Sequence, residues 1–431
     1  MKRKAATIEK NGFFISHYFN CLGWSQVVEN WALSALRVNI LDWVSYSPKG
    51  TFLLLEIELE TGVFFKNKES NQVTEGAILK VLAEVYDPDL HRDIVSLGFV
   101  KNLKISGGKV SFDVELTTPA CPVKDQLKTQ CLEKVKALAG VTEVDVTMTA
   151  NVRSTGTQSN RISIPGVRNV IAVASGKGGV GKSTVTLNLA VALAETGARV
   201  GLLDADIYGP SIPLMIGTKE KPVTEAGRIE PVVKDGIKVM SMGFLVPENQ
   251  PVVWRGPMIH GALTQFLTQV NWGELDYLLI DMPPGTGDAQ LSISQSAPVS
   301  GALIVTTPQE VSLIDARKGL RMFQNVKVPI LGVIENMSGF ICGHCSEVTP
   351  IFRKGGGEKM AQEMGVSLLG AIPLDPRVAE GGDKGTPIVS AHPESEVSKL
   401  YKKLAGDVAA QLSVFQAQSA GQFKPLTLEW Q

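Results

Sequence analysis

One stretch constrains the fold more than any other: residues 171–174 form an apolar run that gives way to glycines and then to a helical pattern. The fixed positions of the phosphate-binding pattern G-x-x-x-x-G-K-[ST], which lies between a strand and a helix, are filled by Gly176, Gly181, Lys182 and Ser183. Glycines let backbone N–H groups surround a phosphate, and the helix adds its positive N-terminal end. We therefore expect Lys182 to reach the β- and γ-phosphates of a nucleotide and Ser183 to hold Mg²⁺. The alternative is a glycine-rich turn that binds nothing.

A second lysine, Lys177, directly follows the first glycine of this loop. In this the loop resembles the deviant Walker A motif, K-G-G-x-G-K-[ST], of the nucleotide-sandwich ATPases of the MinD-like superfamily. The resemblance implies a homodimer in which Lys177 reaches across the interface to the nucleotide of the partner subunit. The nucleotide-binding residues that it implies are Gly176, Lys177, Gly178, Gly179, Val180, Gly181, Lys182, Ser183 and Thr184.

Composition bounds the class of protein. A chain of 431 residues with 44% hydrophobic and 20% charged residues can bury a sizeable core and predicts two or three domains. The net charge of −1 gives no basic field for nucleic acid, and no run of 18 apolar residues indicates a membrane span. We therefore expect neither as a partner. Five cysteines, two of them in a C-x-x-C, indicate a reducing compartment and a metal or redox role.

Residues 1–71 mix aromatic side chains without a sustained period, and we leave them as an unassigned extension apart from one expected strand over residues 51–59. We favour an extension packed on the body of the protein, or a translated upstream stretch. The alternative is a weak organelle presequence, for which Lys2, Arg3, Lys4 and Lys10 are opposed only by Glu9.

Residues 72–150 predict a small α+β domain. Ile78, Leu79, Leu82 and Val85 share a helical face, and we expect Asp87-Pro88 to stop that helix. Residues 100–105 and the alternating residues 110–116, joined by Gly107-Gly108, predict a β-hairpin with one buried face. A helix with Pro122 in its first turn, running to about residue 138, and a strand over residues 144–148 complete the domain.

Three segments of this domain, residues 87–90, 93–98 and 117–122, resemble the small iron-sulfur assembly domain of the MIP18 type. In that family the cysteine of a T-x-x-x-C-P loop is tied to assembly, which here implies Cys121. A helix N-terminus beside this thiol would favour its thiolate. A packing role is the alternative for Cys121, and we expect Cys131, inside the helix, to be core.

Residues 151–168 are polar and without period, which predicts a linker. Residues 169–415 then predict a doubly wound parallel sheet of the P-loop type, with its ligand at the carboxyl ends of the strands, and residues 416–431 a tail. Its strands are expected from short apolar runs without alternation, at residues 171–174, 199–204, 277–281, 302–306, 330–334 and 368–372.

Phosphoryl transfer needs carboxylates at strand ends, where Asp206 and Asp281 lie. Residues 281–288 resemble a Walker B acid that runs into a γ-phosphate-sensing switch, and residues 204–211 resemble a first switch in which Asp206 orients the attacking water. An N-cap or a solvated loop charge is the alternative for either acid. Asn336 follows the strand at 330–334, where the resemblance implies an amide that reads adenine, so we expect ATP.

Cys342 and Cys345 form the only C-x-x-C of the chain. Two thiolates are half of the four soft ligands that a tetrahedral zinc or a 4Fe-4S cluster needs, and a symmetric dimer would supply the other half. A bridging 4Fe-4S cluster, a bridging zinc and a redox dithiol without metal remain open on this ground. His344, between the cysteines, is expected to be a loop residue.

Residues 72–412 as a whole resemble the Mrp/ApbC family of iron-sulfur carrier ATPases. The resemblance implies a cytoplasmic homodimer that hydrolyses ATP with Mg²⁺, receives a bridging 4Fe-4S cluster from an upstream scaffold and delivers it to apo-proteins. An organelle stroma or matrix is the alternative compartment. The alternative function is a positioning ATPase like MinD or ParA, for which the apolar stripe at residues 397–412 would have to face a membrane rather than dock on the sheet.

Overall fold

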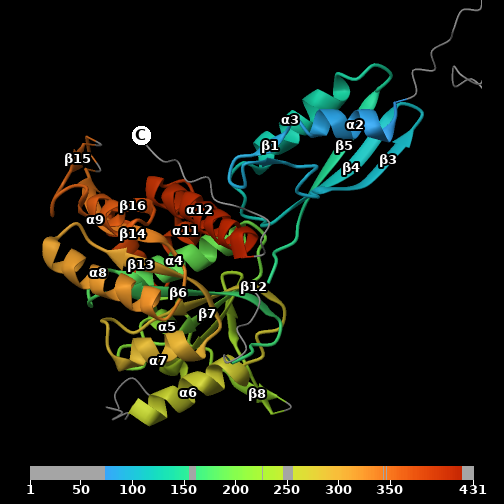
Figure 1. The fold of residues 1–431 in the computed structure, drawn as a ribbon. Coiled ribbons are helices and arrows are strands. Elements are labelled where there is room, and N and C mark those ends of the chain that lie inside the picture. The colour runs from blue at the N-terminus through green and yellow to red at the C-terminus, as the bar shows by residue number, and fades with distance from the viewer. Residues whose placement is uncertain are drawn as a thin grey trace, which may run out of the picture. The chain divides into compact units, whose positions relative to one another are not determined.

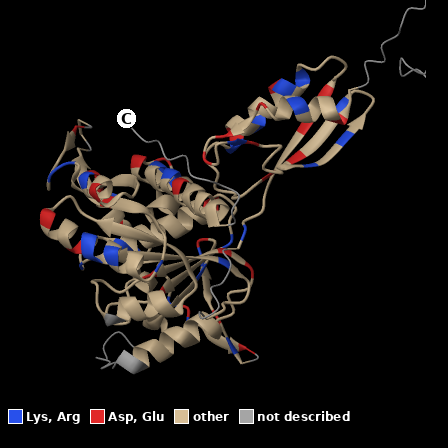
Figure 2. Ribbon diagram, in the orientation of Figure 1, with Lys and Arg blue, Asp and Glu red and all other residues tan. Residues whose placement is uncertain are grey.

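The computed structural model describes residues 73–154, 162–225, 227–245, 256–342, 344–345 and 347–419. The extension 1–71 with its expected strand, the middle of the linker and the end of the C-terminal tail lie outside the described residues. Residues 68–431 form one compact unit. Lys and Arg as well as Asp and Glu occur on several of its helices (Figure 2), in keeping with the small net charge.

A nine-stranded sheet is the centre of the larger part (Figure 1). All of its strand pairs are parallel except those of β10 with β11 and of β15 with β14. In sheet order the strands are β10 (Val232–Lys234), β11 (Ile237–Ser241), β7 (Val200–Asp204), β12 (Leu275–Asp281), β6 (Val167–Ser175), β13 (Val299–Thr306), β14 (Ile330–Ile341) and β15 (Val348–Thr349), while β16 (Leu368–Leu374) pairs with β14. Every residue of β7, β12 and β13 is buried, as expected for runs without alternation.

Helices cover both faces of the sheet, so the predicted doubly wound fold is confirmed. Two separate hydrophobic clusters show the two layers, and Figure 1 shows α4 and α12 on one side of the sheet and α6 and α7 on the other. The first layer holds α4 (Lys182–Glu195), α5 (Ile212–Met215), α10 (Pro376–Lys384), α11 (Ile388–Ala391) and α12 (Glu396–Ser419). The second holds α6 (Gly256–Thr268), α7 (Asp288–Ser296), α8 (Glu310–Asn325) and α9 (Gly356–Met364).

The apolar stripe of α12 docks on the body of the protein. Val397, Leu404, Val408 and Leu412 are buried in the layer that holds α4, and Leu400 is half-buried. None of the described helices combines the length and apolarity that a bilayer crossing requires.

The small α+β part precedes the sheet along the chain. Its elements are α2 (Glu75–Leu82), β1 (Tyr86–Asp87), β2 (Arg92–Asp93), β3 (Val100–Ser106), β4 (Lys109–Leu116), α3 (Lys124–Lys136) and β5 (Glu143–Ala150). The predicted hairpin is β3 and β4, and the alternate residues of β4 from Val110 to Leu116 are buried. Cys131 is fully buried, as expected. The hydroxyl of Tyr277 in β12 donates a buried 2.9 Å hydrogen bond to Thr118 Oγ1, beyond the end of β4.

Several helix ends differ from the expectation. Helix α2 ends at Leu82, not at Asp87-Pro88, because the Glu84 and Val85 N–H groups donate to carbonyls three residues back and not four. The Asp87 carboxylate accepts the N–H groups of Asp89 and Leu90 in a separate turn. Helix α3 begins at Lys124, so Pro122 precedes its first turn. Four antiparallel pairs were not expected: β1 with β2, β8 (Val223–Glu225) with β9 (Arg228–Glu230), β10 with β11, and β14 with β15. The short 3-10 helix η2 (Met242–Phe244) was not expected either.

Candidate nucleotide site and cysteine hairpin

The phosphate-binding pattern lies between β6 and α4, as the sequence predicts. Gly181 precedes α4 with φ of 80°, a left-handed conformation that favours glycine. Gly176 is required for a different reason: a Cβ placed there would lie 2.2 Å from the Asp315 carbonyl carbon of α8. The two fixed glycines therefore shape the loop and allow α8 to approach it closely.

Asp281, the last residue of β12, organises the start of α4. Its carboxylate is fully buried and accepts bonds from Lys182 Nζ at 2.6 Å, from Ser183 Oγ at 2.6 Å and from Thr186 Oγ1 at 2.8 Å. Lys182 is only 6% exposed. The two predicted residues Lys182 and Ser183 are thus joined to the predicted acid, and Thr186 is a third partner that sequence reasoning missed.

The same residues suit Mg²⁺. The Ser183 hydroxyl and the Asp281 carboxylate are hard oxygen donors, and their oxygens lie 2.6 Å apart. The nearby Lys182 ammonium and the N-terminus of α4 suit the phosphates that such an ion accompanies. When bound, Mg²⁺ would supply charge for the phosphate oxygens.

Asp204, the last residue of β7, is the main site residue that the sequence reasoning did not single out. Its fully buried carboxylate accepts bonds from Ser241 Oγ at 2.9 Å, from the Asp206 N–H at 3.1 Å and from the Ile212 N–H at 3.4 Å. Burial, and then the charge of Asp281, raise the pKa of Asp204 to about 8. Asp204 therefore fixes both ends of the loop between β7 and α5, and the signal for it was an acid ending an apolar strand.

Asp206 lies in that loop, half-buried. Its Oδ1 accepts the Gly209 N–H at 3.3 Å. Burial raises the pKa of Asp206, while the Lys182 ammonium lowers it and Asp281 raises it. Asp206 thus lies within electrostatic reach of Lys182 and Asp281.

Asn336 lies beside the phosphate-binding loop. It belongs to β14, which continues well past the apolar run that predicted it. Its Nδ2 donates to the Val180 carbonyl at 2.9 Å. The next residue, Met337, has φ of 56°, and the pairing of β14 with β16 shifts register between Asn336 and Phe340. The strand therefore bends directly after the residue expected to read adenine.

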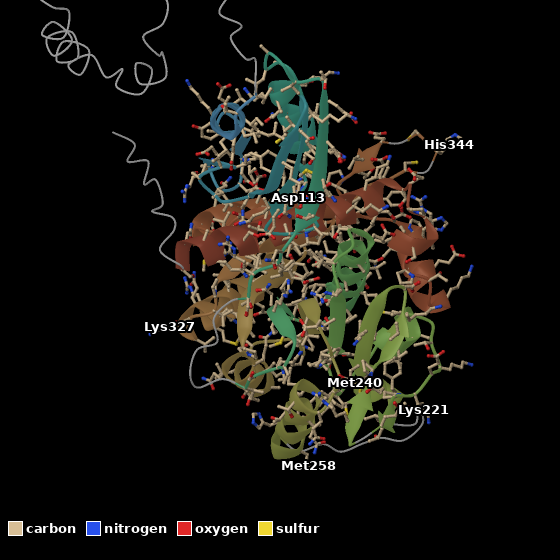
Figure 3. All side chains as sticks on the ribbon, turned by 90° about the vertical axis from the view of Figure 1, so that its right-hand side faces the viewer. Asp113, Lys221, Met240, Met258, Lys327 and His344 are labelled. Atoms are coloured by element: carbon tan, nitrogen blue, oxygen red, sulfur yellow. The ribbon has the colours of Figure 1, made fainter. Side chains whose placement is uncertain are left out.

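The C-x-x-C occupies the turn between β14 and β15. Phe340 and Ile341 pair with Thr349 and Val348, and the Cys342 N–H donates to the Glu347 carbonyl at 3.0 Å. Cys342 is half-buried and Cys345 is exposed. The Cys345 N–H, and then the His344 N–H and the Cys345 thiol, lower the pKa of Cys342. Figure 3 shows His344 projecting outward from the tip of this hairpin.

The expected thiolate of Cys121 is not favoured in the structure, and the role of this residue in assembly stays a prediction. Cys121 is half-buried against the core of the small α+β part, three residues before α3 begins. Burial raises the pKa of its thiol to about 11, which outweighs the Val123 N–H that lowers it. The helix terminus does not favour a thiolate here because desolvation is the larger effect.

Lys177 and the loop after Asp281 complete the site. The Lys177 carbonyl accepts a bond from Ser175 Oγ, and no carboxylate in the described part of the chain forms an ion pair with the Lys177 ammonium. In the loop 282–287, the Gly285 N–H donates to the Ser175 carbonyl at 3.1 Å, while Thr286 and Gly287 are exposed. The loop is held at its start and open at its end.

Comparisons with known proteins agree with this geometry. Residues 166–409 match the family described as "NUBPL iron-transfer P-loop NTPase", and residues 75–146 match the family described as "Iron-sulfur cluster assembly protein". The iron-sulfur cluster carrier protein of Synechocystis sp. is 51% identical over 79% of this chain and 99% of its own length. The chloroplastic Fe-S cluster assembly factor HCF101 of Arabidopsis thaliana is 44% identical over 80% of this chain and 66% of its own length.

Among solved structures, the nucleotide-binding protein from Archaeoglobus fulgidus in complex with ADP is 41% identical, covers 55% of this chain and 93% of its own, and superposes with a TM-score of 0.49. The two family matches cover the sheet domain and the small α+β part in the order in which the structure has them. The chain therefore belongs to the Mrp/ApbC-type iron-sulfur cluster carrier family of P-loop NTPases, with an iron-sulfur assembly domain before the nucleotide-binding domain.

Proposed function

We propose that this protein is a homodimeric ATPase that carries a 4Fe-4S cluster and transfers it to apo-proteins. In the proposed site Lys182 contacts the β- and γ-phosphates and Ser183 holds Mg²⁺, fixed by Asp281. Asp206 orients the attacking water, and Lys177 acts on the nucleotide of the partner subunit. The backbone of residues 176–184 surrounds the phosphates. The Lys177 ammonium forms no ion pair with a carboxylate of the described residues, which supports its role across a dimer.

ATP is the proposed nucleotide because of Asn336. Its amide contacts the phosphate-binding loop at Val180 and is only 9% exposed, so it is already positioned beside the nucleotide site. An amide can both donate to and accept from the adenine edge.

The proposed cargo is a 4Fe-4S cluster shared by Cys342 and Cys345 of two subunits. The thiolate is the form that binds metal, and the pKa of Cys342 is lowered in this hairpin. Cys345 is exposed at the turn, where a second copy of the hairpin can approach. A bridging zinc would use the same four thiolates, so the metal is the part of the proposal that experiment must decide.

One observation carries the link between the nucleotide and the cargo: Asn336 lies in β14, and Cys342, six residues further on, directly follows the last residue of that strand. The bend at Met337 lies between them, and Asn336 is bonded to the phosphate-binding loop. A change at the nucleotide therefore has a short covalent path to the cysteine hairpin. Rotation of two subunits would also change access to a shared cluster.

The domain boundaries are proposed at residues 72–150, 151–168 and 169–415, with the tail at 416–431. Strand β6 begins at Val167 and α12 continues to Ser419, so these limits are drawn by sequence and not by element ends. The small domain, with Cys121, is proposed to help load or deliver the cluster received from an upstream scaffold. The cytoplasm is the proposed compartment, with an organelle stroma or matrix as the alternative.

The test is anaerobic cluster reconstitution followed by transfer to an apo-protein whose activity needs a 4Fe-4S cluster. We expect the parent protein to show the visible spectrum of the cluster and to transfer it at a rate that depends on ATP. Cys342→Ala and Cys345→Ala should each lose the cluster and keep ATP binding. His344→Ala, at the same tip, is the matched control and should keep both. A stable cluster in the double cysteine variant would contradict the assignment of ligands.

A further inference from the structure

Gln290, in the first turn of α7, is a buried polar residue that the proposed mechanism does not yet use. Its side chain is 1% exposed, and its Nε2 donates to the Pro283 carbonyl at 3.3 Å. Its Oε1 is buried and has no hydrogen-bond partner among the described residues. Pro283 belongs to the loop 282–287 that follows Asp281. Gln290 thus holds that loop through its Nε2, while its Oε1 is an acceptor without a donor among the described residues.

The loop itself indicates which donor this acceptor can take. Pro283 and Pro284 have no N–H group, and the N–H groups of Met282 and Gly285 already donate to Val173 and Ser175. Thr286 and Gly287 remain. Within the described part of the chain, neither N–H group has a protein acceptor, and both residues are exposed.

Of these two residues, Gly287 has the right position. It is the N-cap of α7, and Gln290 is three residues further on. This is the capping-box spacing, in which a Gln side chain at the third helical position accepts the N–H of the N-cap residue. Gly287 has no side chain and cannot make the reciprocal bond of a capping box, so the bond from its N–H to Gln290 Oε1 is the half of the box that this helix start can form.

We propose that Gln290 is a positioning residue for the loop 282–287. When the loop closes on the γ-phosphate of ATP, Gln290 Oε1 accepts the Gly287 N–H while Nε2 keeps the Pro283 carbonyl in place. This rests on the proposed γ-phosphate-sensing function of the loop. Because the new bond forms only in the closed loop, Gln290 favours ATP over ADP rather than binding both equally.

The test compares the affinities of the full-length protein for ADP and for a non-hydrolysable ATP analogue, with Mg²⁺, by calorimetry. Gln290→Met keeps the volume and removes both polar atoms. We expect the analogue to bind about five- to tenfold more weakly, as for the loss of one buried hydrogen bond, and ADP affinity to stay within about twofold. The kcat for ATP should fall while thermal stability is kept, since an unsatisfied buried group is also removed.

Ser294→Ala is the matched control. Ser294 is buried in the same helix and donates to the Gln290 carbonyl at 2.7 Å, so this variant perturbs α7 without touching the Gln290 amide. It should keep the preference for the ATP analogue. Gly287→Pro provides a second route if Gln290→Met does not fold: it removes the donor N–H at an exposed residue whose φ of −82° a proline tolerates. Gly287→Ala keeps the N–H and should lose less of the preference than Gly287→Pro.

Equal weakening of ADP and of the ATP analogue in Gln290→Met, or no change in either, would overturn the role of Gln290. If the parent protein itself does not distinguish the two nucleotides, the loop is not a γ-phosphate sensor, and both the proposed function of the loop and this inference fail. If the parent protein and Gln290→Met prefer the ATP analogue over ADP to the same extent, the loop can still be a γ-phosphate sensor, and only the role of Gln290 is refuted.

Discussion

The buried pair of Lys182 and Asp281 should stabilise the sheet as well as bind nucleotide. Its atoms lie 2.6 Å apart, and the two side chains are 6% and 0% exposed. Removing one partner of such a pair leaves the other charge buried without compensation, which costs about 3–5 kcal/mol. We expect this cost in the protein without nucleotide, where no phosphate can take the place of Asp281.

Asp281→Asn should lower the free energy of unfolding by about 3 kcal/mol, the lower end of this range. The charge of Asp281 is the second cause that raises the pKa of Asp204, so its removal lets Asp204 ionise more readily near Lys182. Lys182→Met should cost a similar amount, although Ser183 and Thr186 still donate to the remaining carboxylate. The double variant removes both charges, and it should cost less than the sum of the two by about 2 kcal/mol.

Hydrogen exchange of the backbone amides of β6 and β12, at pH 7 without nucleotide, measures the free energy of opening of this part of the sheet. The two single variants and the double variant form a thermodynamic cycle. If the two single costs add up to the cost of the double variant within about 0.5 kcal/mol, Lys182 and Asp281 do not interact in the folded protein.

Four further predictions concern separate features. Lys182→Ala and Lys177→Ala should each abolish ATP turnover, and the Lys177 variant should keep its monomer fold; full turnover by it would exclude action across a dimer. The free energy of unfolding should fall as the pH rises from about 5 to 8, because burial raises the pKa of Asp204 in the folded protein above its value in the unfolded chain, and the folded protein loses this proton over that range. In urea titrations, Asp204→Asn should reduce this dependence on pH. Iodoacetamide at pH 8 should label Cys342 well before Cys121, since the pKa of the first thiol is lowered and that of the second is raised to about 11; equal rates would contradict this. A fragment beginning at Ser163 should still bind ATP and a cluster but melt at a lower temperature, because Tyr277 loses its bond to Thr118, and loss of nucleotide binding would show that the boundary is misplaced.

The sheet and the phosphate-binding loop could be predicted because their signals are local. Strands buried on both faces are short apolar runs, and a loop that cradles phosphate needs glycines at fixed spacing. The hairpin of β3 and β4 was equally readable from its alternation. The contacts that could not be predicted join residues that are distant along the chain. Ser241 reaches Asp204 across 37 residues, and no period connects them.

Strand β14 shows the same limit. Its apolar run stops before Glu335 and Asn336, yet the strand continues because both polar side chains find buried partners. The Gly357 N–H donates to Glu335 at 2.5 Å, and Asn336 donates to Val180. The prediction of a favoured thiolate at Cys121 shows a different limit. The sequence shows that this residue precedes a helix, but only the packing around it reveals the desolvation that raises the pKa of its thiol.

Native mass spectrometry of the anaerobically reconstituted protein can decide whether the cysteine hairpins of two subunits share one cluster. We expect a dimer that carries one 4Fe-4S cluster, and we expect both Cys342→Ala and Cys345→Ala to lose it. A monomer that carries a complete cluster, or a dimer that carries two, would contradict a shared cluster.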